Sequence, residues 1–289
     1  MKDPLDIVYK SAKTYTRLGM EGPNGESSYG ENTQGTLQKA FEFWHLKDPT
    51  FGSEGDIFLD VGHGLGKPNV HYSQLGSKKK ISIGIECSEH RYNLSIRWHK
   101  DMIGSLKNEE LNGGFCFVHL DGLELQTLNP FKHIFMFDCG YSKQFCLRLA
   151  TLLKACKTLE TFASWRTVFF WREKGLDLKS VGQFTTSLLG SKENKTGYIY
   201  RIEKQNNNNK KMAIEDNDVN LQCDPKLEDA IRVCRSTIDD QISFVKNAYS
   251  NIEVRQQTYK SRSTVVNINY YIIIVIIRTW RILQTPTRN

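Results

Sequence analysis

The chain lacks several features that would assign it to a specialised class of protein. Its seven cysteines are scattered and none forms a C-x-x-C pair, so we expect neither a metal site nor a disulfide framework. No apolar leader follows the amino terminus. The apolar run at residues 265–277 is short and contains two asparagines, so we expect no membrane span. These absences favour an intracellular protein with no membrane partner.

The length and net charge do not determine the number of domains or the role of the basic end. A chain of 289 residues holds one large domain or two small ones. The formal net charge is +7, and from residue 245 onward seven basic residues face Glu253 alone. Such a segment attracts polyanions, including nucleic acid and nucleosomes, or is simply a solvated basic end. Nothing in the sequence indicates an oligomeric state.

Short apolar runs alternate with helical patterns through the middle of the chain. Strands are predicted at residues 56–61, 81–86, 114–120, 133–138 and 161–165, with later strands at 168–171 and 197–203. Helices are predicted at residues 34–46, 67–75, 90–103 and 143–154. This order predicts an α/β fold with a mainly parallel sheet flanked by helices.

The remaining segments set the predicted domain boundaries. Residues 1–26 are an extension with helical character near residues 6–18, and residues 27–203 form the α/β domain. The stretch QNNNNKK falls within a low-complexity linker at residues 204–225. Residues 226–289 form a basic tail with a helix at residues 226–249 and a β-prone or irregular apolar segment at residues 265–277.

A glycine-rich loop follows the first predicted strand. It reads Asp60, Val, Gly62, His, Gly64, Leu, Gly66, and glycine there permits positive φ angles and close approach of a ligand. The alternative is a strand–helix turn that binds no ligand and needs glycine only for its backbone geometry. The dinucleotide fingerprint requires a small residue where Lys67 stands, and the G-K-[ST] of a P-loop is missing. The loop therefore favours a ligand that is held without a phosphate.

The motif of an acid followed by G-x-G-x-G resembles the first motif of class I S-adenosylmethionine-dependent methyltransferases, which have a Rossmann-like fold. Glu86 ends the next strand about 20 residues after the last glycine, where a carboxylate accepts both ribose hydroxyls of an adenosine. In the methyltransferase pattern Asp121, after the third strand, suits the adenine amino group. The alternative is that Glu86 and Asp121 are surface acids at strand ends that bind no ligand.

The fourth strand ends in Asp138-Cys-Gly-Tyr141, which resembles the [D/N]-x-x-[F/Y] active-site motif of amine methyltransferases. An oxygen of Asp138 would orient the amine in line with the methyl–sulfur bond, and the ring of Tyr141 would face a cation. The alternative is a helix-capping Asp beside a core Tyr. Burial among aromatic side chains would help an acceptor lysine lose its proton. The candidate walls are Phe137, Tyr141, Trp165, Phe169 and Trp171.

Together with an upstream Tyr29-Gly-Glu31-Asn-Thr33 segment, these motifs resemble the Dot-one (disruptor of telomeric silencing) family of histone-lysine methyltransferases, in a divergent protist-type branch. The resemblance covers roughly residues 27–202. It implies that Tyr29, Glu31 and Thr33 close over the methionine end of S-adenosylmethionine. It also implies cofactor contacts for Asp60, Gly62, Gly64, Gly66 and Glu86.

The resemblance predicts a nuclear enzyme that methylates a lysine amine, of the type acting on lysine seventy-nine of histone H-three, with a histone or nucleosome as partner. Three positions depart from the family: His63 replaces a small residue, Asn32 is inserted, and Asp138 replaces an Asn. The alternatives are another acceptor amine, on a nucleic-acid base, a small molecule or a different protein, and an inactive cofactor-binding module. Contact with nucleic acid through the basic tail is a further expectation.

Overall fold

The computed structural model describes residues 4–16, 31–75, 80–105, 114–187, 194–203, 222–236, 247, 249–250, 252–253 and 274–277. Tyr29 and most of the predicted basic tail lie outside these residues, so the predictions made for them remain predictions. No described helix is long and apolar enough to cross a membrane.

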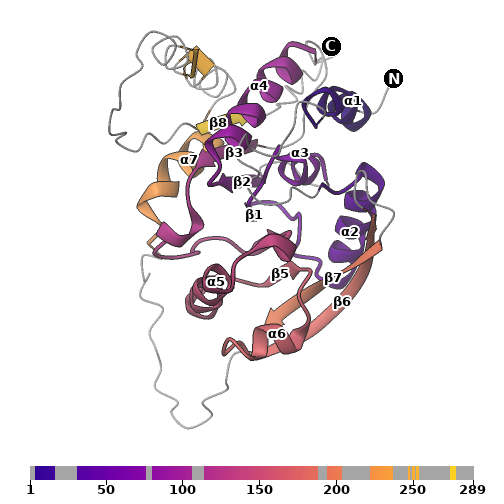
Figure 1. Ribbon diagram of the computed structural model, residues 1–289, viewed down its shortest axis with the longest axis vertical. Coiled ribbons are helices and arrows are strands. Elements are labelled where there is room, and N and C mark those ends of the chain that lie inside the picture. Colours follow the sequence, from indigo (N-terminus) through magenta and orange to yellow (C-terminus); the bar gives the residue numbers. More distant parts are fainter. Residues whose placement is uncertain are drawn as a thin grey trace, which may run out of the picture.

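The core of the molecule is a single sheet with strand order β6-β7-β5-β4-β1-β2-β3-β8 (Figure 1). Strands β1 to β5 pair in parallel, whereas β6, β7 and β8 pair antiparallel. The predicted mainly parallel α/β sheet is thus confirmed. The strands are β1 (Ile57–Val61), β2 (Ile81–Glu86), β3 (Gly114–His119), β4 (His133–Met136), β5 (Thr161–Ser164), β6 (Leu178–Ser187), β7 (Asn194–Ile202) and β8 (Ile274–Ile277).

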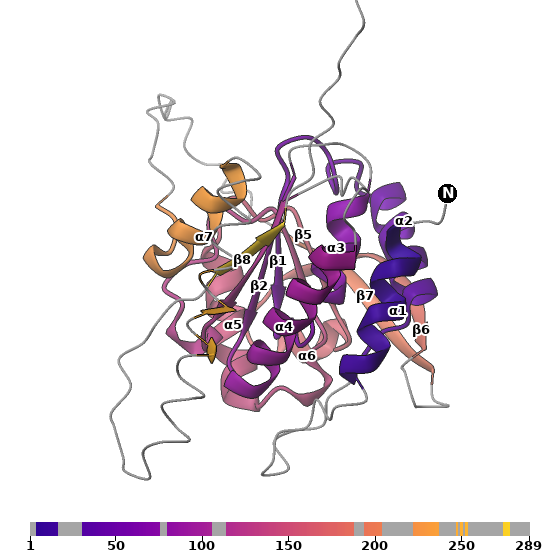
Figure 2. The same ribbon diagram turned by 90° about the horizontal axis from the view of Figure 1, so that it is seen from above.

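Helices cover both faces of the sheet (Figures 1 and 2). One face carries α1 (Pro4–Thr16), α2 (Gln34–Lys47), α3 (Lys67–Gln74) and α4 (Glu89–Ser105). The other carries α5 (Lys143–Ala155), α6 (Val168–Arg172) and α7 (Pro225–Arg235). Two short 3-10 turns, η1 (Gly122–Glu124) and η2 (Asp138–Gly140), follow β3 and β4.

The central strands are buried on both sides because successive side chains point to opposite faces. On β1, Phe58 stacks on Tyr72 with ring centroids 4.4 Å apart and meets Phe41 edge-on at 5.9 Å, within the cluster under α1–α4. Its neighbour Leu59 belongs to the cluster under α5–α7. This two-sided burial explains why the predicted strands read as continuous apolar runs rather than as alternating patterns.

Both ends of the chain add to this core. Val8 and Ala12 of α1 are fully buried in the cluster on one face, and Leu227 and Ala230 of α7 in the cluster on the other. Strand β8 pairs with β3. The fold therefore extends on both sides of residues 27–203, where the sequence analysis set the domain limits.

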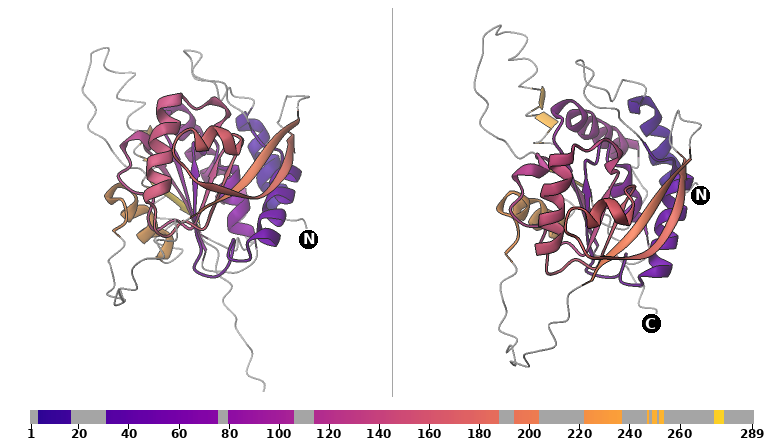
Figure 3. Two further views of the ribbon diagram at one scale, coloured as in Figure 1. Left: turned by 90° about the horizontal axis from the view of Figure 1, so that it is seen from below. Right: turned by 60° about the horizontal axis from the view of Figure 1, so that its bottom comes forward.

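One prediction near the carboxyl side of the sheet is wrong, and one strand there was not predicted. Residues 168–171 form helix α6 rather than a strand, because Trp171 returns to donate its ring N–H to the Ser164 hydroxyl at 2.9 Å. An extended chain would carry it on the order of 20 Å away. Strand β6 was not predicted, since its two faces are mostly polar and its pairing shifts register between Ser180 and Gly182. Figure 3 shows the long, curved β6–β7 hairpin at the sheet edge.

Candidate functional site

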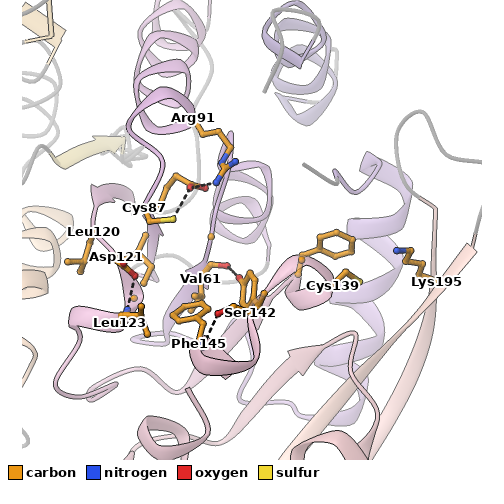
Figure 4. A pocket seen from close by; sticks show the side chains of 17 residues that line it. Val61, Cys87, Arg91, Leu120, Asp121, Leu123, Cys139, Ser142, Phe145 and Lys195 are labelled. Atoms are coloured by element: carbon orange, nitrogen blue, oxygen red, sulfur yellow. Dashed lines mark hydrogen bonds and ion pairs between the residues drawn. The ribbon is translucent and has the colours of Figure 1, made fainter. Parts of the chain in front are cut away.

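A cavity of about 480 Å³ opens at the carboxyl edge of the parallel strands (Figure 4). Its walls come from the residues at or just after the ends of β1, β2, β3 and β4, with one residue from β7. The sequence-predicted residues Gly62, Glu86, Asp121 and Tyr141 all line it. They meet there because the carboxyl ends of parallel strands lie at one edge, the usual position of ligands in open α/β sheets. Pockets of this size hold small ligands of drug or nucleoside dimensions.

Four amides of the glycine loop, those of Gly62, His63, Gly64 and Gly66, donate to groups of the chain itself. Those of Gly62 and His63 donate to the Ile85 carbonyl at 2.8 and 3.0 Å, and that of Gly64 donates to the Glu86 carboxylate at 3.0 Å. The Gly66 amide donates back to the His63 carbonyl at 2.7 Å. A phosphate-binding loop needs such amides free and aimed at the ligand. The loop therefore offers no seat for a phosphate.

Two of these glycines are required by close contacts as well as by positive φ angles. The hydroxyl of Tyr141 donates to the Val61 carbonyl and lies over Gly62 (φ 68°), where a Cβ would come within 2.9 Å of it. At Gly66 (φ 88°) a Cβ would meet the Phe117 ring at 2.1 Å. Burial, with nearby carboxylates as a lesser cause, raises the pKa of Tyr141 well above its usual value, so its hydroxyl stays a donor.

One end of the cavity is acidic. The buried Glu86 carboxylate pairs with Arg91 at 3.0 Å and accepts the amides of Ser88 and Gly64 at 2.9 and 3.0 Å. Oε1 also accepts the Cys87 thiol at 3.8 Å, whereas Oε2 accepts the Gly64 amide alone and so keeps one acceptor position for a ligand. Asp121 uses one oxygen to accept the Leu123 amide at 2.9 Å, as Figure 4 shows.

A small hollow of about 30 Å³ lies on the other side of Gly62 and Phe137, which line both spaces. Two buried acceptors on residues that line it, Asp60 Oδ2 and Asn32 Oδ1, have no hydrogen-bond partner. Burial and then the neighbouring Glu86 raise the pKa of Asp60 well above its usual value. The hollow therefore suits an N–H donor, and an ammonium group would satisfy it best.

Glu31 also lines this hollow, where it forms a buried ion pair with Lys67 at 2.6 Å. Burial lowers the pKa of Lys67, and the Glu31 carboxylate opposes that shift. Lys67 is the first residue of α3, where a cation is unfavourable near the positive end of the helix. The pair explains how a lysine is tolerated at the position where the dinucleotide fingerprint requires a small residue.

His63 lies behind the loop rather than in the main cavity. Its ring stacks on Phe117 at 4.3 Å, and His99 meets the same ring edge-on at 4.3 Å. Burial lowers the pKa of His63 well below its usual value, so the ring is neutral. A Cβ on Gly84 would come within 2.8 Å of the His63 side chain, so β2 leaves room for the imidazole by carrying glycine there. His63 thus fills space under the loop.

Asp138 does not face the cavity, although its neighbours on both sides line it. Its side chain is fully buried, accepts the Ser164 hydroxyl hydrogen through Oδ2, and accepts the Trp165 amide at 2.8 Å through Oδ1. Burial raises the pKa of Asp138 to about 6, against the lowering effect of these hydrogen bonds. The expected contact of Asp138 with an acceptor amine is therefore not present, because η2 turns the carboxylate toward the end of β5.

Of the other predicted residues, some line the cavity and some do not. Phe137 and Tyr141 line the cavity, whereas Trp165 packs behind Phe137 at 4.8 Å. Trp171 is fully buried on the opposite face, and Phe169 is 71% exposed. Thr33 caps α2 by accepting the Thr36 amide at 3.3 Å and lies in neither space. Of the five predicted aromatic walls, two serve as walls.

Several lining residues were not predicted. Cys87, Arg91 and Phe145 come from loops and helices that follow the strand ends, where no motif marks them. Cys139 stands inside the D-x-x-Y motif, at a position that the motif leaves unspecified. Lys195 reaches the cavity from β7, and only the hairpin topology brings it there. Among the described residues no group of three or more His, Cys, Asp or Glu side chains is placed to hold a metal ion.

No family model matches the chain, and no curated protein matches it. Among solved structures, a magnesium protoporphyrin IX methyltransferase from Synechocystis with bound S-adenosylmethionine is 13% identical, over 71% of this chain and 99% of that one, with a TM-score of 0.46. An RNA methyltransferase described as putative, from Pyrococcus horikoshii, is 17% identical over 71% and 98%, with a TM-score of 0.44. An S-adenosylmethionine-dependent methyltransferase from Aquifex aeolicus is 15% identical over 70% and 100%, with a TM-score of 0.41.

Proposed function

We propose that this protein transfers a methyl group from S-adenosylmethionine to an acceptor bound in the cavity. The observation that carries the proposal is that two carboxylates, Glu86 and Asp121, line the cavity next to a glycine loop in which the three glycine amides donate within the chain. The carboxylates suit the ribose and base of a nucleoside. The loop disfavours the phosphates of a nucleotide.

The rest of the cavity and the hollow fit the remaining part of this cofactor. Asp60 and Asn32 hold the two unsatisfied acceptors that an α-ammonium group would pair with. Phe137 lines both the hollow and the main cavity, and Tyr141 lines the main cavity over Gly62. Aromatic faces there would stabilise a sulfonium by about 0.5–2 kcal/mol. When bound, the cofactor supplies an electrophilic methyl group.

The chain's own contribution to the reaction is positioning. Tyr141 is fixed by its bond to the Val61 carbonyl, so its ring holds one place over Gly62. The aromatic walls exclude water from the space next to it. Such fixed placement of two reactants is a large source of rate in group transfer. Asp138 supports the backbone of η2 from behind, since both its oxygens are used there.

The finer hypothesis is that the acceptor is a lysine amine of a histone, in the nucleus. It is supported by the resemblance of the Tyr-Gly-Glu-Asn-Thr, glycine-loop and D-x-x-Y motifs to the Dot-one family. The position of Asp138 weakens it, because no carboxylate of η2 faces the cavity to orient an amine. The same observation favours a second candidate, a module that binds the cofactor without turnover.

A methyl-transfer experiment separates these hypotheses. The purified protein is incubated with methyl-labelled S-adenosylmethionine and, separately, nucleosomes, free histones, RNA and DNA. Label in a histone lysine supports the finer hypothesis, and label only in nucleic acid contradicts it. Cofactor binding with no label in any of these arms, or in an added arm with a pool of small amines, supports the binding module. The Gly62→Val variant, whose side chain would occupy the place of the Tyr141 hydroxyl, is the inactive control.

A further inference from the structure

The end of the cavity away from Glu86 and Asp121 has its own chemistry. Phe137, Cys139 and Lys195 form it, and Figure 4 shows the amine of Lys195 directed toward Cys139. This end lies beyond Tyr141, so a methyl group held near the tyrosine would face it. It is the place where an acceptor would bind.

The charge at this end is positive. Lys195 stands half-buried on β7, and no carboxylate of the described residues forms an ion pair with it. Arg166 lies next to this end but outside the cavity lining, and its Nη2 donates to the Cys139 carbonyl at 3.0 Å. Arg91, the other cation of the cavity, is different, since Glu86 neutralises it.

Among the described residues, the only carboxylates that line the cavity are those of Glu86 and Asp121, at its other end. The Asp138 carboxylate is fully buried behind η2, and both of its oxygens are hydrogen-bonded there. Burial raises the pKa of the Cys139 thiol. The Asp138 carboxylate adds to this shift, whereas Lys195 and Arg166 oppose it, so the thiol is neutral near pH 7. A half-buried cation with no partner is costly to leave unpaired.

We infer that the acceptor carries an anionic group, a carboxylate or a phosphate, which pairs with Lys195 and sets the atom to be methylated beside Tyr141. This inference rests on the proposed methyl transfer, names its substrate class and argues against the finer hypothesis of a lysine acceptor. An acceptor lysine would bring a second ammonium next to the Lys195 amine, where like charges repel. Lys195 is thus a specificity-determining residue that selects against cationic acceptors.

The test uses four ligands with the same ring and different charges: benzoate, benzyl phosphate, benzyl alcohol and benzylammonium. Each is titrated into the full-length protein and followed by NMR, with and without saturating S-adenosylhomocysteine. We expect at least one anion to bind about tenfold more tightly than the alcohol, and benzylammonium to bind most weakly. A preference for benzoate indicates a carboxylic acid acceptor, and a preference for benzyl phosphate indicates a phosphorylated one.

Variants of Lys195 test whether this residue causes the preference for anions. Lys195→Met should remove it, and Lys195→Glu should reverse it in favour of benzylammonium. Lys179→Met is the matched control, because Lys179 is an exposed lysine on the same hairpin and outside the cavity lining. The inference is overturned if the native protein binds the cation as well as the anions, if it binds none of the four, or if Lys195→Met keeps the anion preference. Loss of S-adenosylhomocysteine binding alone would instead count against the proposed function, since the anion series is also measured without it.

Discussion

The Asp138 carboxylate accepts the hydroxyl hydrogen of Ser164. The serine oxygen in turn accepts two N–H groups, from the Arg166 backbone at 3.0 Å and the Trp171 ring at 2.9 Å. Its two lone pairs are therefore used, and its one hydrogen has to go to residue 138. The Trp165 amide at 2.8 Å points at the other carboxylate oxygen. Only a side chain with two acceptors fits this position, which explains why Asp stands where the resembled motif carries Asn.

Asp138→Asn should therefore destabilise the protein. The amide NH2 would face either a filled serine oxygen or a backbone N–H, and one donor would be left buried without an acceptor. Hydrogen bonds to charged groups contribute about 1.5–3 kcal/mol, so we expect a loss of this size in the free energy of unfolding, measured by urea denaturation. Combining the change with Ser164→Ala should cost less than the sum of the two single changes. Native stability in Asp138→Asn with activity lost would mean that Asp138 acts on the acceptor after all.

Three Gly→Ala variants separate backbone strain from steric contact. Gly175 has φ 83° and open space around it, so the change should cost only the strain of the left-handed region, about 1–2 kcal/mol. Gly66→Ala adds a contact with the Phe117 ring at 2.1 Å and should cost about 2–5 kcal/mol. Gly62→Ala displaces the Tyr141 hydroxyl and should weaken cofactor binding more than stability. Thermal unfolding of the three variants under one condition gives the ranking of their stabilities. An equal loss of stability at Gly66 and Gly175 would show that a Cβ at position 66 does not clash with the Phe117 ring.

Glu86 should be the acid that matters most for binding the cofactor. Glu86→Gln replaces an oxygen that faces Arg91 or the Gly64 amide by an NH2 group, so the loop loses an acceptor and the ribose its partner. A loss of about 1.5–3 kcal/mol corresponds to roughly a 10–150-fold weaker affinity for S-adenosylhomocysteine. Glu124→Gln, an acid paired with Lys226 outside the cavity lining, is the control and should bind normally. Equal affinity of both variants for S-adenosylhomocysteine would show that Glu86 does not bind the cofactor.

Buried histidines should make the protein lose stability in acid. Burial lowers the pKa of His99 from 6.5 to about 3 and that of His71 from 6.5 to about 4. His71 lies between the Tyr9 hydroxyl at 2.9 Å and the Gln38 side-chain oxygen at 2.8 Å, a pairing that suits the neutral ring. Because the unfolded chain takes up protons below pH 6.5 and the folded chain does not, stability should fall as the pH drops from 6.5 toward 4. We expect His99→Phe to flatten this profile, measured by urea denaturation at several pH values, because the substituted ring takes up no proton in either state.

Asp138 should make the free energy of unfolding fall as the pH rises, which is opposite to the effect of the histidines and covers a narrower pH range. Its pKa is about 6 in the folded protein and 3.8 without the fold, so the folded state holds this proton more tightly. The stability linked to it is complete below pH 3.8 and is lost as the pH rises through 6. NMR titration of the Asp138 carboxyl carbon reads this pKa directly, and a midpoint near 4 would contradict the buried environment described for it.

The part of the site that sequence reasoning predicts follows from topology alone. Gly62, Glu86, Asp121 and Tyr141 each stand at or just after the end of a strand, and parallel strands bring those ends together whatever the side chains between them. Asp138 is only three residues from Tyr141, yet the two side chains point to opposite sides of η2. That difference depends on Ser164 and Trp165, which no local pattern links to residue 138.

Lys195, a lining residue that sequence reasoning missed, is placed by long-range antiparallel pairing. Lys195 faces Thr186 across the β6–β7 hairpin, and β7 follows β5 at the sheet edge. Because β6 has no apolar alternation, neither its existence nor the position of Lys195 over the cavity could be read from periodicity. The aromatic run at residues 168–171 has the composition of a strand, and only the Trp171–Ser164 bond explains the helix.

One measurement tests the central claim, that the cavity holds an adenosine without phosphates, most directly. Isothermal titration calorimetry compares S-adenosylhomocysteine, ATP and NAD on the same folded preparation, with Gly62→Val as the blocked control. The three ligands share adenosine and differ in phosphate, so a loop whose three glycine amides donate within the chain should discriminate among them. We predict stoichiometric binding of S-adenosylhomocysteine, no detectable binding of ATP or NAD, and no binding of any of the three by the variant. Binding of ATP or NAD in preference to S-adenosylhomocysteine would contradict the account.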